Sequence, residues 1–233
     1  MDKSAIRDAA TIILVRDAAT APRVLMGLRG ANAAFMPDRF VFPGGALDAG
    51  DRDVPLAGEL SQPCLNRLSE DCVGDIGPAL AAAAIRELWE EAGLILGQPG
   101  AWPGAVPADW ADFAASGFVP TPTPLSFVFR AITPPGRPRR FDARFFLADA
   151  DCLAGDPDDF SRASDELSHL QWIALDEVRH FHLPFITEVV LAEIAAALPD
   201  LGPPASVPFF NNTQEESLFL RLGGKRPLQG RAE

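Results

Sequence analysis

The sequence predicts an α+β fold in which a mixed β-sheet is covered by helices on both faces. Short β-branched or alternating apolar segments recur along the chain, as is typical of strands. Two longer segments, residues 78–92 and 184–198, place apolar side chains at helical spacing, and the later one is expected to cover the face of the sheet opposite the first. With 233 residues, 48% of them apolar, the chain fits one domain with a sizeable core.

The first elements form a hairpin that leads into a glycine turn. Residues 9–15 are a β-branched run, residues 17–22 a turn, and residues 23–29 a returning strand. Residues 40–42 are a short strand that enters the run Pro43-Gly44-Gly45. Adjacent glycines let the backbone approach a ligand or metal, because no Cβ stands in the way.

The predicted helix at residues 78–92 carries three carboxylates at spacings of three and four. Glu87, Glu90 and Glu91 therefore lie on one helix face, where like charges repel. A hard divalent cation such as Mg²⁺ or Mn²⁺ offsets such repulsion, whereas a solvated acidic face is the simpler alternative. The other side of the helix is small and apolar, and Gly93 suits the position just past its end.

The later segments predict further strands and short helices. Strands are expected at residues 94–96, 126–133, 141–148 and 169–174, and short helices at residues 62–70, 108–115 and 175–179. Loops are expected at residues 97–104, 120–124 and 149–166. The tail from residue 209 is expected to add an edge strand near residues 218–220 before an exposed end.

Composition bounds the partners and the compartment. A net charge of −12 argues against nucleic acid, whose phosphates select Lys and Arg patches, but a bound metal can invert the local sign for a small phosphorylated ligand. Cys64, Cys72 and Cys152 show neither a paired framework nor metal-ligand spacing, which is typical of reduced cytoplasmic thiols. We also expect no membrane partner, because no apolar run reaches the roughly 18 residues of a span.

The acidic helix resembles the second half of the Nudix box, the motif of the Nudix hydrolase superfamily. The run Arg86-Glu87-Leu88-x-Glu90-Glu91-x-Gly93-Leu94 matches R-E-U-x-E-E-x-G-U, where U is aliphatic. The first half, G-x5-E, resembles Gly45 to Asp51, with Asp51 in place of the family's glutamate. Arg86 follows Gly45 by 41 positions where the family pattern has fourteen, so 27 extra residues form an insert at about 52–77.

An insert inside the box is similar to the coenzyme A diphosphatase branch of the family, the peroxisomal type and its bacterial relatives. That branch also resembles this chain in the runs Leu25 to Arg29, Phe35 to Gly45 and Arg130 to Phe146. The insert contains no recognisable group of catalytic residues. It is expected to be either a lid over the site or a surface loop that the fold tolerates.

The resemblance implies an α/β/α sandwich, the Nudix fold, that hydrolyses a nucleoside diphosphate linked to another moiety. It implies Mg²⁺ or Mn²⁺ as cofactor, with Gly45, Glu87, Glu90 and Glu91 as ligands. The residues implied in catalysis are Glu87, Glu90, Glu91, Arg86, Asp51 and, from a late loop, Glu166 or its neighbour Asp165. The whole chain, 1–233, is then one Nudix domain with a C-terminal helix and tail at about 184–233.

Coenzyme A or an acyl derivative is the first-choice substrate that the branch implies. An ADP-ribose, dinucleotide or nucleotide-sugar hydrolase is the nearest alternative, and a non-catalytic ligand-binding module is the alternative from another class. The candidate phosphate-binding residues are Arg29, Arg130, Arg140 and Arg144, because guanidinium geometry suits phosphate. Pairing of some of them with local carboxylates such as Asp142 is the alternative. Many relatives pair, so a homodimer is also expected.

Overall fold

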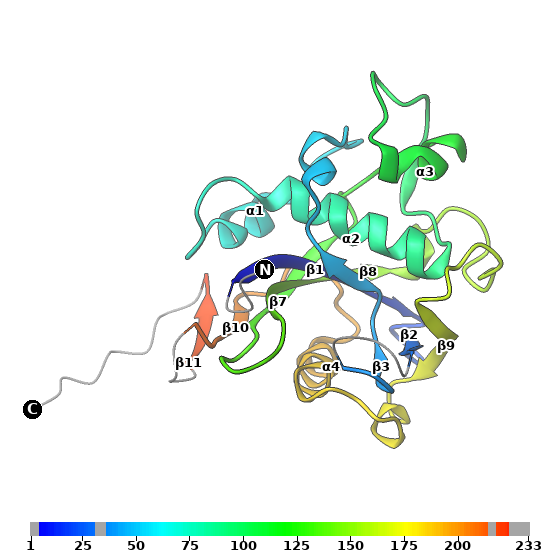
Figure 1. Ribbon diagram of the computed structural model, residues 1–233. Helices are drawn as coiled ribbons and strands as arrows, with labels where there is room; N and C mark the ends of the chain where they lie inside the picture. The colour runs from blue at the N-terminus through cyan, green and yellow to red at the C-terminus, as the bar shows by residue number, and fades with distance from the viewer. Residues whose placement is uncertain (1–4, 31–35, 214–217, 224–233) are drawn as a thin grey trace, which may run out of the picture.

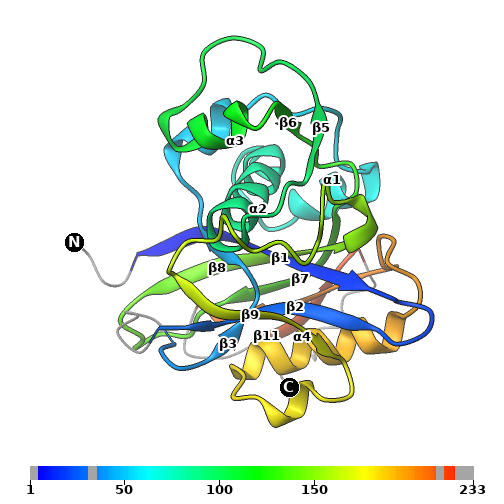
Figure 2. The same cartoon turned by 90° about the vertical axis from the view of Figure 1, so that its right-hand side faces the viewer.

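The computed structural model describes residues 5–30, 36–213 and 218–223. A mixed nine-stranded sheet forms the middle layer, with α1, α2 and α3 on one face and α4 on the other (Figures 1 and 2). The helices have the bounds α1 Gln62–Leu68, α2 Gly77–Ala92, α3 Ala111–Ala115 and α4 Phe185–Ala197. The prediction of an α+β fold with a mixed sheet between helices is confirmed.

The sheet is organised around its longest strand, β1. Strands follow the order β11-β10-β7-β8-β1-β2-β3, with β4 added to β1 and β9 added to β2. Their bounds are β1 Ile6–Arg16, β2 Arg23–Arg29, β3 Phe40–Val41, β4 Gly44–Ala46, β7 Ser126–Ile132, β8 Arg140–Asp149, β9 Leu167–Ala174, β10 Val207–Asn211 and β11 Leu218–Leu222. Because β1 pairs in parallel with β8 and antiparallel with β2 and β4, it brings segments that are distant in the sequence to one place.

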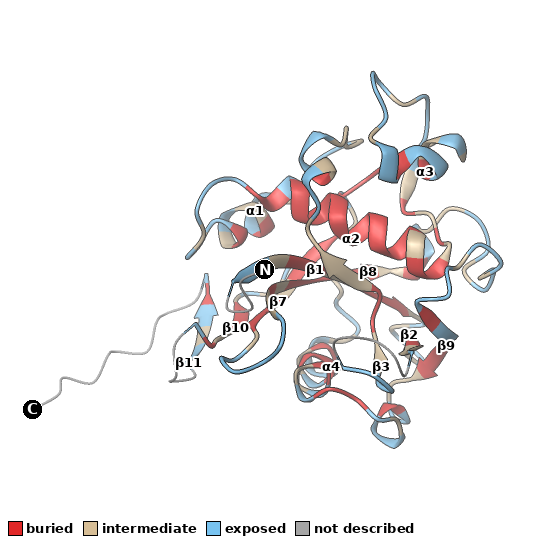
Figure 3. Cartoon of the chain, in the orientation of Figure 1, coloured by how far each residue is buried: buried red, intermediate tan, exposed pale blue. Residues whose placement is uncertain are grey.

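Helix α2 lies close to the sheet because its inner side is built from alanine. Ala81 to Ala84 are fully buried, together with Ile85 and Leu88, and Figure 3 shows the helix buried along almost its whole length. On the opposite face, α4 buries Val190, Leu191 and Ile194, which recur at helical spacing. The two amphipathic helices therefore cover the two faces of the sheet, as predicted.

Part of the insert belongs to the hydrophobic core. Leu60, Cys64 and Leu68 are buried in the same cluster as α2. The Cys64 sulfur lies 3.3 Å from the backbone nitrogen of Phe127 on β7, and Arg130 on β7 donates to the carbonyl of Glu70 at 2.9 Å. Helix α1 therefore covers the β7 end of the sheet beside α2.

Three differences from the sequence prediction involve short strands. Strand β10 forms where a chain end without regular structure was expected, and it pairs in parallel with β7. A separate hairpin, β5 (Gly97–Pro99) and β6 (Phe118–Pro120), forms where loops were expected, while Ile95 makes only an isolated bridge to Ala154. Each is stabilised by a partner far along the chain, so local patterns did not reveal it.

The predicted edge strand of the tail is present as β11, which pairs antiparallel with β10. The tail beyond residue 223 and Phe35 of the Phe35-to-Gly45 run lie outside the described residues. No helix in the described ranges is long and apolar enough to cross a membrane.

Candidate active site

Strand β4 lies directly against two carboxylates of α2, and the missing Cβ of Gly45 makes room for one of them. A Cβ at Gly45 would come within 2.2 Å of Glu87 Oε1, so only glycine leaves room for that carboxylate. The backbone N–H of Gly44 donates to Glu91 Oε2 at 2.8 Å. The Pro-Gly-Gly turn therefore packs directly on the carboxylates of α2.

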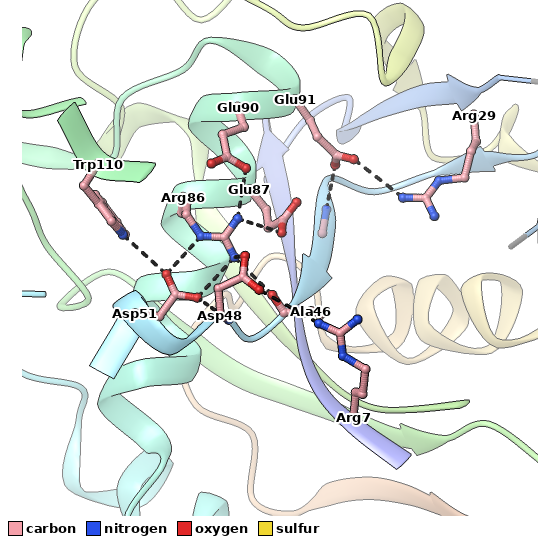
Figure 4. A network of polar contacts seen from close by, with 11 residues as sticks. Arg7, Arg29, Ala46, Asp48, Asp51, Arg86, Glu87, Glu90, Glu91 and Trp110 are labelled. Atoms are coloured by element: carbon pink, nitrogen blue, oxygen red, sulfur yellow. Dashed lines mark hydrogen bonds and ion pairs between the residues drawn. The ribbon is translucent and has the colours of Figure 1, made fainter. Parts of the chain in front are cut away.

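Arg86 lies at the centre of the polar network (Figure 4). On one side it donates from Nε and Nη2 to both oxygens of Asp51, at 2.9 and 3.1 Å, and from Nη2 to the carbonyl of Ala46 at 3.0 Å. On the other side Nη1 donates to Glu87 Oε1 at 3.0 Å and to Glu90 Oε2 at 2.9 Å. These bonds use all five N–H groups of the guanidinium, so Arg86 has none left for a substrate.

Asp51 is the buried partner that holds Arg86. Its side chain is fully buried and also accepts from the backbone N–H of Asp48 at 2.9 Å and from Trp110 Nε1 at 3.3 Å. Asp51 sits in a short 3₁₀ turn, Ala49–Asp53, which directs the carboxylate at the helix. Although aspartate is one methylene shorter than the family's glutamate, it reaches Arg86 in a bidentate arrangement.

The electrostatics of the three glutamates follow from burial. Burial raises the pKa of Glu87 to about 7, against the lowering effect of Arg86. Burial, together with the charge of Glu87, raises the pKa of Glu91 to about 8. Burial also raises the pKa of Glu90, which is partly exposed. Burial opposes the charge on Arg86, but the hydrogen bond to Asp51 and the surrounding carboxylates raise its pKa, so it remains charged.

Glu91 differs from its neighbours because its charge is poorly compensated. Only 1% of its side chain is exposed, and its Oε1 atom has no hydrogen-bond partner among the described residues. The nearest cation is Arg29 on β2, whose Nη2 lies 3.5 Å from that oxygen and whose side chain is 23% exposed. Arg29 therefore lies at the rim of the site, beside Glu91.

The loop before β9 brings Glu166 to the carboxylates. Its backbone is fixed at Ser164, whose N–H donates to the carbonyl of Glu90 at 3.0 Å. Gly93 ends α2 at φ +73°, and a Cβ there would lie 2.9 Å from Arg162 of this loop. Burial is the main cause of the raised pKa of Glu87 and Glu91, and the charge of Glu166 adds to both. The charge of Glu166 is therefore close enough to act on both carboxylates.

The other three candidate arginines are engaged within the chain. Arg130 donates to both oxygens of Asp142, at 2.9 and 2.7 Å, and Arg144 lies 3.2 Å from the same carboxylate. Arg140 donates to the backbone carbonyls of Thr133 and Asn212. For Arg130 and Arg144 the structure thus shows the alternative, pairing with Asp142, and their contacts do not support phosphate binding.

The donor set fits a divalent cation in chemistry. Carboxylate and carbonyl oxygens are the ligands that Mg²⁺ and Mn²⁺ prefer, and the buried Oε1 of Glu91 has a lone pair that no described donor uses. In the described part of the chain, however, no three Asp, Glu, His or Cys side chains form a group that could hold a metal. The reason is visible in the hydrogen bonds: Arg86 holds Glu87 and Glu90, while Gly44 holds Glu91.

Sequence reasoning missed three residues that complete this site. Gly44 was given no role, although its N–H binds Glu91. Asp48 lies 3.7 Å from Arg86 and donates its backbone N–H to Asp51. Trp110 donates its indole N–H to Asp51; a buried indole needs an acceptor, but the sequence does not show which one.

The chain resembles known proteins in sequence and in structure, although no family model matches it. The Caenorhabditis elegans protein named "Putative nudix hydrolase 7" is 32% identical over 181 residues, which are 73% of this chain and 52% of that protein. The chain thus spans about half the length of this relative. The crystal structure of a NUDIX hydrolase from Alicyclobacillus acidocaldarius has a TM-score of 0.62 at 27% identity, and the match covers 86% of this chain and 98% of that one. The fold is the Nudix fold, and with the box residues described above these likenesses support the assignment of the chain to the Nudix hydrolase superfamily.

Proposed function

We propose that this protein is a divalent-cation-dependent hydrolase that cleaves the pyrophosphate bond of a nucleoside diphosphate linked to another moiety. The observation that carries the proposal is the state of Glu91. Its carboxyl group is buried against Gly44, it has an oxygen without a hydrogen-bond donor in the described residues, and its pKa is raised to about 8. A carboxyl group in this state is stabilised by a cation that takes the place of its proton.

Glu87, Glu90, Glu91 and the Gly45 carbonyl are the proposed ligands of Mg²⁺ or Mn²⁺. When bound, the cation supplies positive charge to the pyrophosphate and acidifies the attacking water. Arg86 contributes by orientation, because its donors already hold Glu87 and Glu90 in place. Asp51 supports Arg86 from the other side.

Proton transfer is proposed for Glu87 or Glu166. A pKa of about 7 lets Glu87 accept a proton from water near neutral pH, which is the condition for an effective general base. Glu166 is exposed on the loop beside Glu87 and Glu91, so it can serve if Glu87 is engaged by the cation. Arg29, at the rim beside Glu91, is the proposed contact for a substrate phosphate.

Coenzyme A or acyl-CoA is the first-choice substrate, with phosphopantetheine and adenosine 3′,5′-bisphosphate as products. Support comes from the resemblance of the insert and of the Leu25 to Arg29 run to the coenzyme A diphosphatase branch. ADP-ribose, a dinucleotide or a nucleotide sugar is the alternative substrate class. A non-catalytic binding module is the third possibility, but the chain retains all three box glutamates, as a catalyst requires.

The test is phosphate-resolved turnover of coenzyme A, ADP-ribose, NADH and diadenosine polyphosphates, with Mg²⁺ and with Mn²⁺. The variants are Glu91→Gln and, as the matched control, Glu188→Gln, which makes the same substitution at an exposed glutamate on α4. We expect coenzyme A to be cleaved fastest and only Glu91→Gln to lose activity. Preference for another diphosphate would remove the coenzyme A assignment, and no cleavage in either metal would favour the binding module.

The proposed setting is the cytoplasm, with a small nucleotide derivative as ligand and no nucleic acid or membrane partner. Cys64, Cys72 and Cys152 are free thiols in the structure, which suits a reducing compartment. A homodimer is also proposed from the family resemblance, and sedimentation of the purified chain tests it.

A further inference from the structure

An aromatic segment outside the box packs onto both halves of the box. It consists of the 3₁₀ turn Ala108–Trp110 and helix α3, and its Trp110 and Phe113 are each 1% exposed. The Phe113 ring lies 5.2 Å from that of Trp110 and 5.7 Å from that of Trp89 on the box helix. The segment therefore has one anchor on the box helix, after the insert.

The second anchor lies before the insert, at the turn that carries Asp51. Gly50 faces this segment, since a Cβ there would lie 3.5 Å from Pro107. The indole N–H of Trp110 donates to Asp51 Oδ1 at 3.3 Å, and the same oxygen accepts from Arg86 Nε at 2.9 Å. Trp110 is thus one bond from Asp51 and two bonds from Arg86, which holds the catalytic carboxylates.

Each oxygen of Asp51 accepts two hydrogen bonds. In the described residues, Arg86 and Trp110 are the only side chains that donate to Asp51. Oδ1 accepts from Arg86 and Trp110, while Oδ2 accepts from Arg86 and the backbone of Asp48. Without the indole N–H, Oδ1 would keep a buried lone pair unused, and the carboxylate could rotate away from its bidentate arrangement. That rotation would move Arg86, and with it the bonds to Glu87 and Glu90.

We propose that Trp110 is a positioning residue for the hydrolysis proposed above, acting through Asp51 and Arg86 on Glu87 and Glu90. The inference rests on that proposed function. The aromatic segment also holds the two halves of the box together across the insert. It contacts Asp51 before the insert and Trp89 after it.

The chain offers a matched control in the same aromatic cluster. Trp102 packs on Trp110, with ring centroids 5.7 Å apart, and its buried Nε1 has no hydrogen-bond partner among the described residues. Trp102→Phe and Trp110→Phe therefore remove the same atoms from one cluster, but only the second removes a bond to Asp51. Trp102 is half-buried and Trp110 is fully buried, so a purely packing role predicts a larger loss of melting temperature for Trp110→Phe without a loss of Mn²⁺ affinity.

The experiment measures Mn²⁺ affinity by electron paramagnetic resonance, together with kcat, KM and melting temperature, in the full chain. For Trp110→Phe we expect Mn²⁺ affinity and kcat to fall about 10- to 100-fold, the usual range for groups that orient metal ligands, with KM changed less than about twofold. For Trp102→Phe we expect both to stay within about twofold of the unaltered protein. Benzothienylalanine at position 110, an isostere with sulfur in place of the indole N–H, should reproduce the Trp110→Phe losses without a change of shape.

Each other outcome overturns a defined claim. If Trp110→Phe and Trp102→Phe lose affinity and kcat equally, or neither loses them, Trp110 is not a positioning residue. If benzothienylalanine restores full affinity, shape rather than the N–H is responsible, and the inference is again wrong. If the unaltered protein neither binds Mn²⁺ nor cleaves any diphosphate, the proposed function fails, and the inference fails with it.

Discussion

The two ends of the carboxylate row on α2 differ in how their charges are satisfied. At the Arg86 end, all five guanidinium N–H groups are bonded and both oxygens of Asp51 have two donors each. At the Glu91 end, one buried oxygen has no donor among the described residues, and the nearest cation, Arg29, is 3.5 Å away. The first end is complete within the chain, and the second is not.

This difference distinguishes the part of the site that fixes the geometry from the part that binds a ligand. Buried charges that are fully paired fix a geometry, whereas a buried carboxyl group without a partner gives up its charge and takes a proton. The raised pKa of Glu91, about 8, is the consequence. We therefore assign structural support to Arg86 and Asp51, and cation binding to Glu91 and its neighbours.

The largest expected effect is on catalysis at the incomplete end. Glu91→Gln should lower turnover roughly 10³-fold, because it removes a fixed charge that acts on the transition state through the cation. The metal-free variant should melt no lower than the unaltered protein at pH 8, since the amide removes a buried acid. Calorimetric melting and steady-state kinetics measure the two. Near-normal turnover of Glu91→Gln would exclude Glu91 as a ligand.

The next effect is on stability at the complete end. Arg86→Met should lower the free energy of unfolding by about 3–5 kcal/mol, because it leaves Asp51 as an unpaired buried charge. Arg29→Met, the matched change at the rim, should lower it by less than about 1 kcal/mol while raising KM. Urea denaturation of both variants checks this contrast. Equal losses in the two variants would show that the two ends do not differ as described.

A pH effect of a few kcal/mol is expected in the metal-free protein. The folded-state pKa values of Glu91 and Glu87, about 8 and about 7, lie above the ordinary glutamate pKa of 4.5. Below about pH 4.5 both states are protonated, so the contribution of these groups to stability is fully present. It is lost as pH rises toward 8, because the unfolded chain releases these protons first, and above that pH it stays lost.

Denaturation in EDTA between pH 5 and 9 measures this pH effect. Glu91→Gln should make the fall in unfolding free energy smaller, and excess Mn²⁺ should restore stability at pH 8 by binding the folded state. A stability that rises with pH over this range would contradict the assignment of raised pKa values.

The smallest effect distinguishes the two acidic residues before β9. Glu166→Gln should lower turnover about tenfold, at the low end for a group in proton transfer or at the edge of a metal site. Asp165→Asn should leave turnover within about twofold, since we propose the role for Glu166, whose charge acts on both Glu87 and Glu91. Steady-state kinetics of the two variants test this difference. A larger loss of turnover in Asp165→Asn than in Glu166→Gln would transfer the proposed role to Asp165.

The sequence was informative where local pattern decides structure. The hairpin, the box helix and α4 each follow from periodicity and from glycine or proline at their ends, and the helix bounds agree to within one residue. The sequence predicted a close approach to backbone at Gly44 and Gly45 from their missing Cβ atoms, but not that Glu87 itself makes the approach at Gly45. Strand β10 did not follow, since its pairing with β7 joins residues about 80 positions apart.

The arginine contacts were partly accessible from the sequence. Arg130 lies opposite Arg144 in the β7–β8 pair. Asp142 precedes Arg144 by two residues, so its side chain lies on the same face of the sheet, diagonally across from Arg130. That register makes pairing with Asp142 the expected outcome once the hairpin is known. The Trp110 bond was not accessible, because it depends on how the aromatic segment folds back over the turn at Asp51.

The most direct test of the account is calorimetric titration of Mn²⁺ into the metal-free protein at pH 7, in two buffers of different ionisation enthalpy. Because Glu91 holds its proton at this pH and Glu87 holds part of one, we expect binding to release between about one and two protons, and Glu91→Gln to release about one fewer. Binding without proton release, or unchanged binding in Glu91→Gln, would contradict the claim that the incomplete end of the carboxylate row is the cation site.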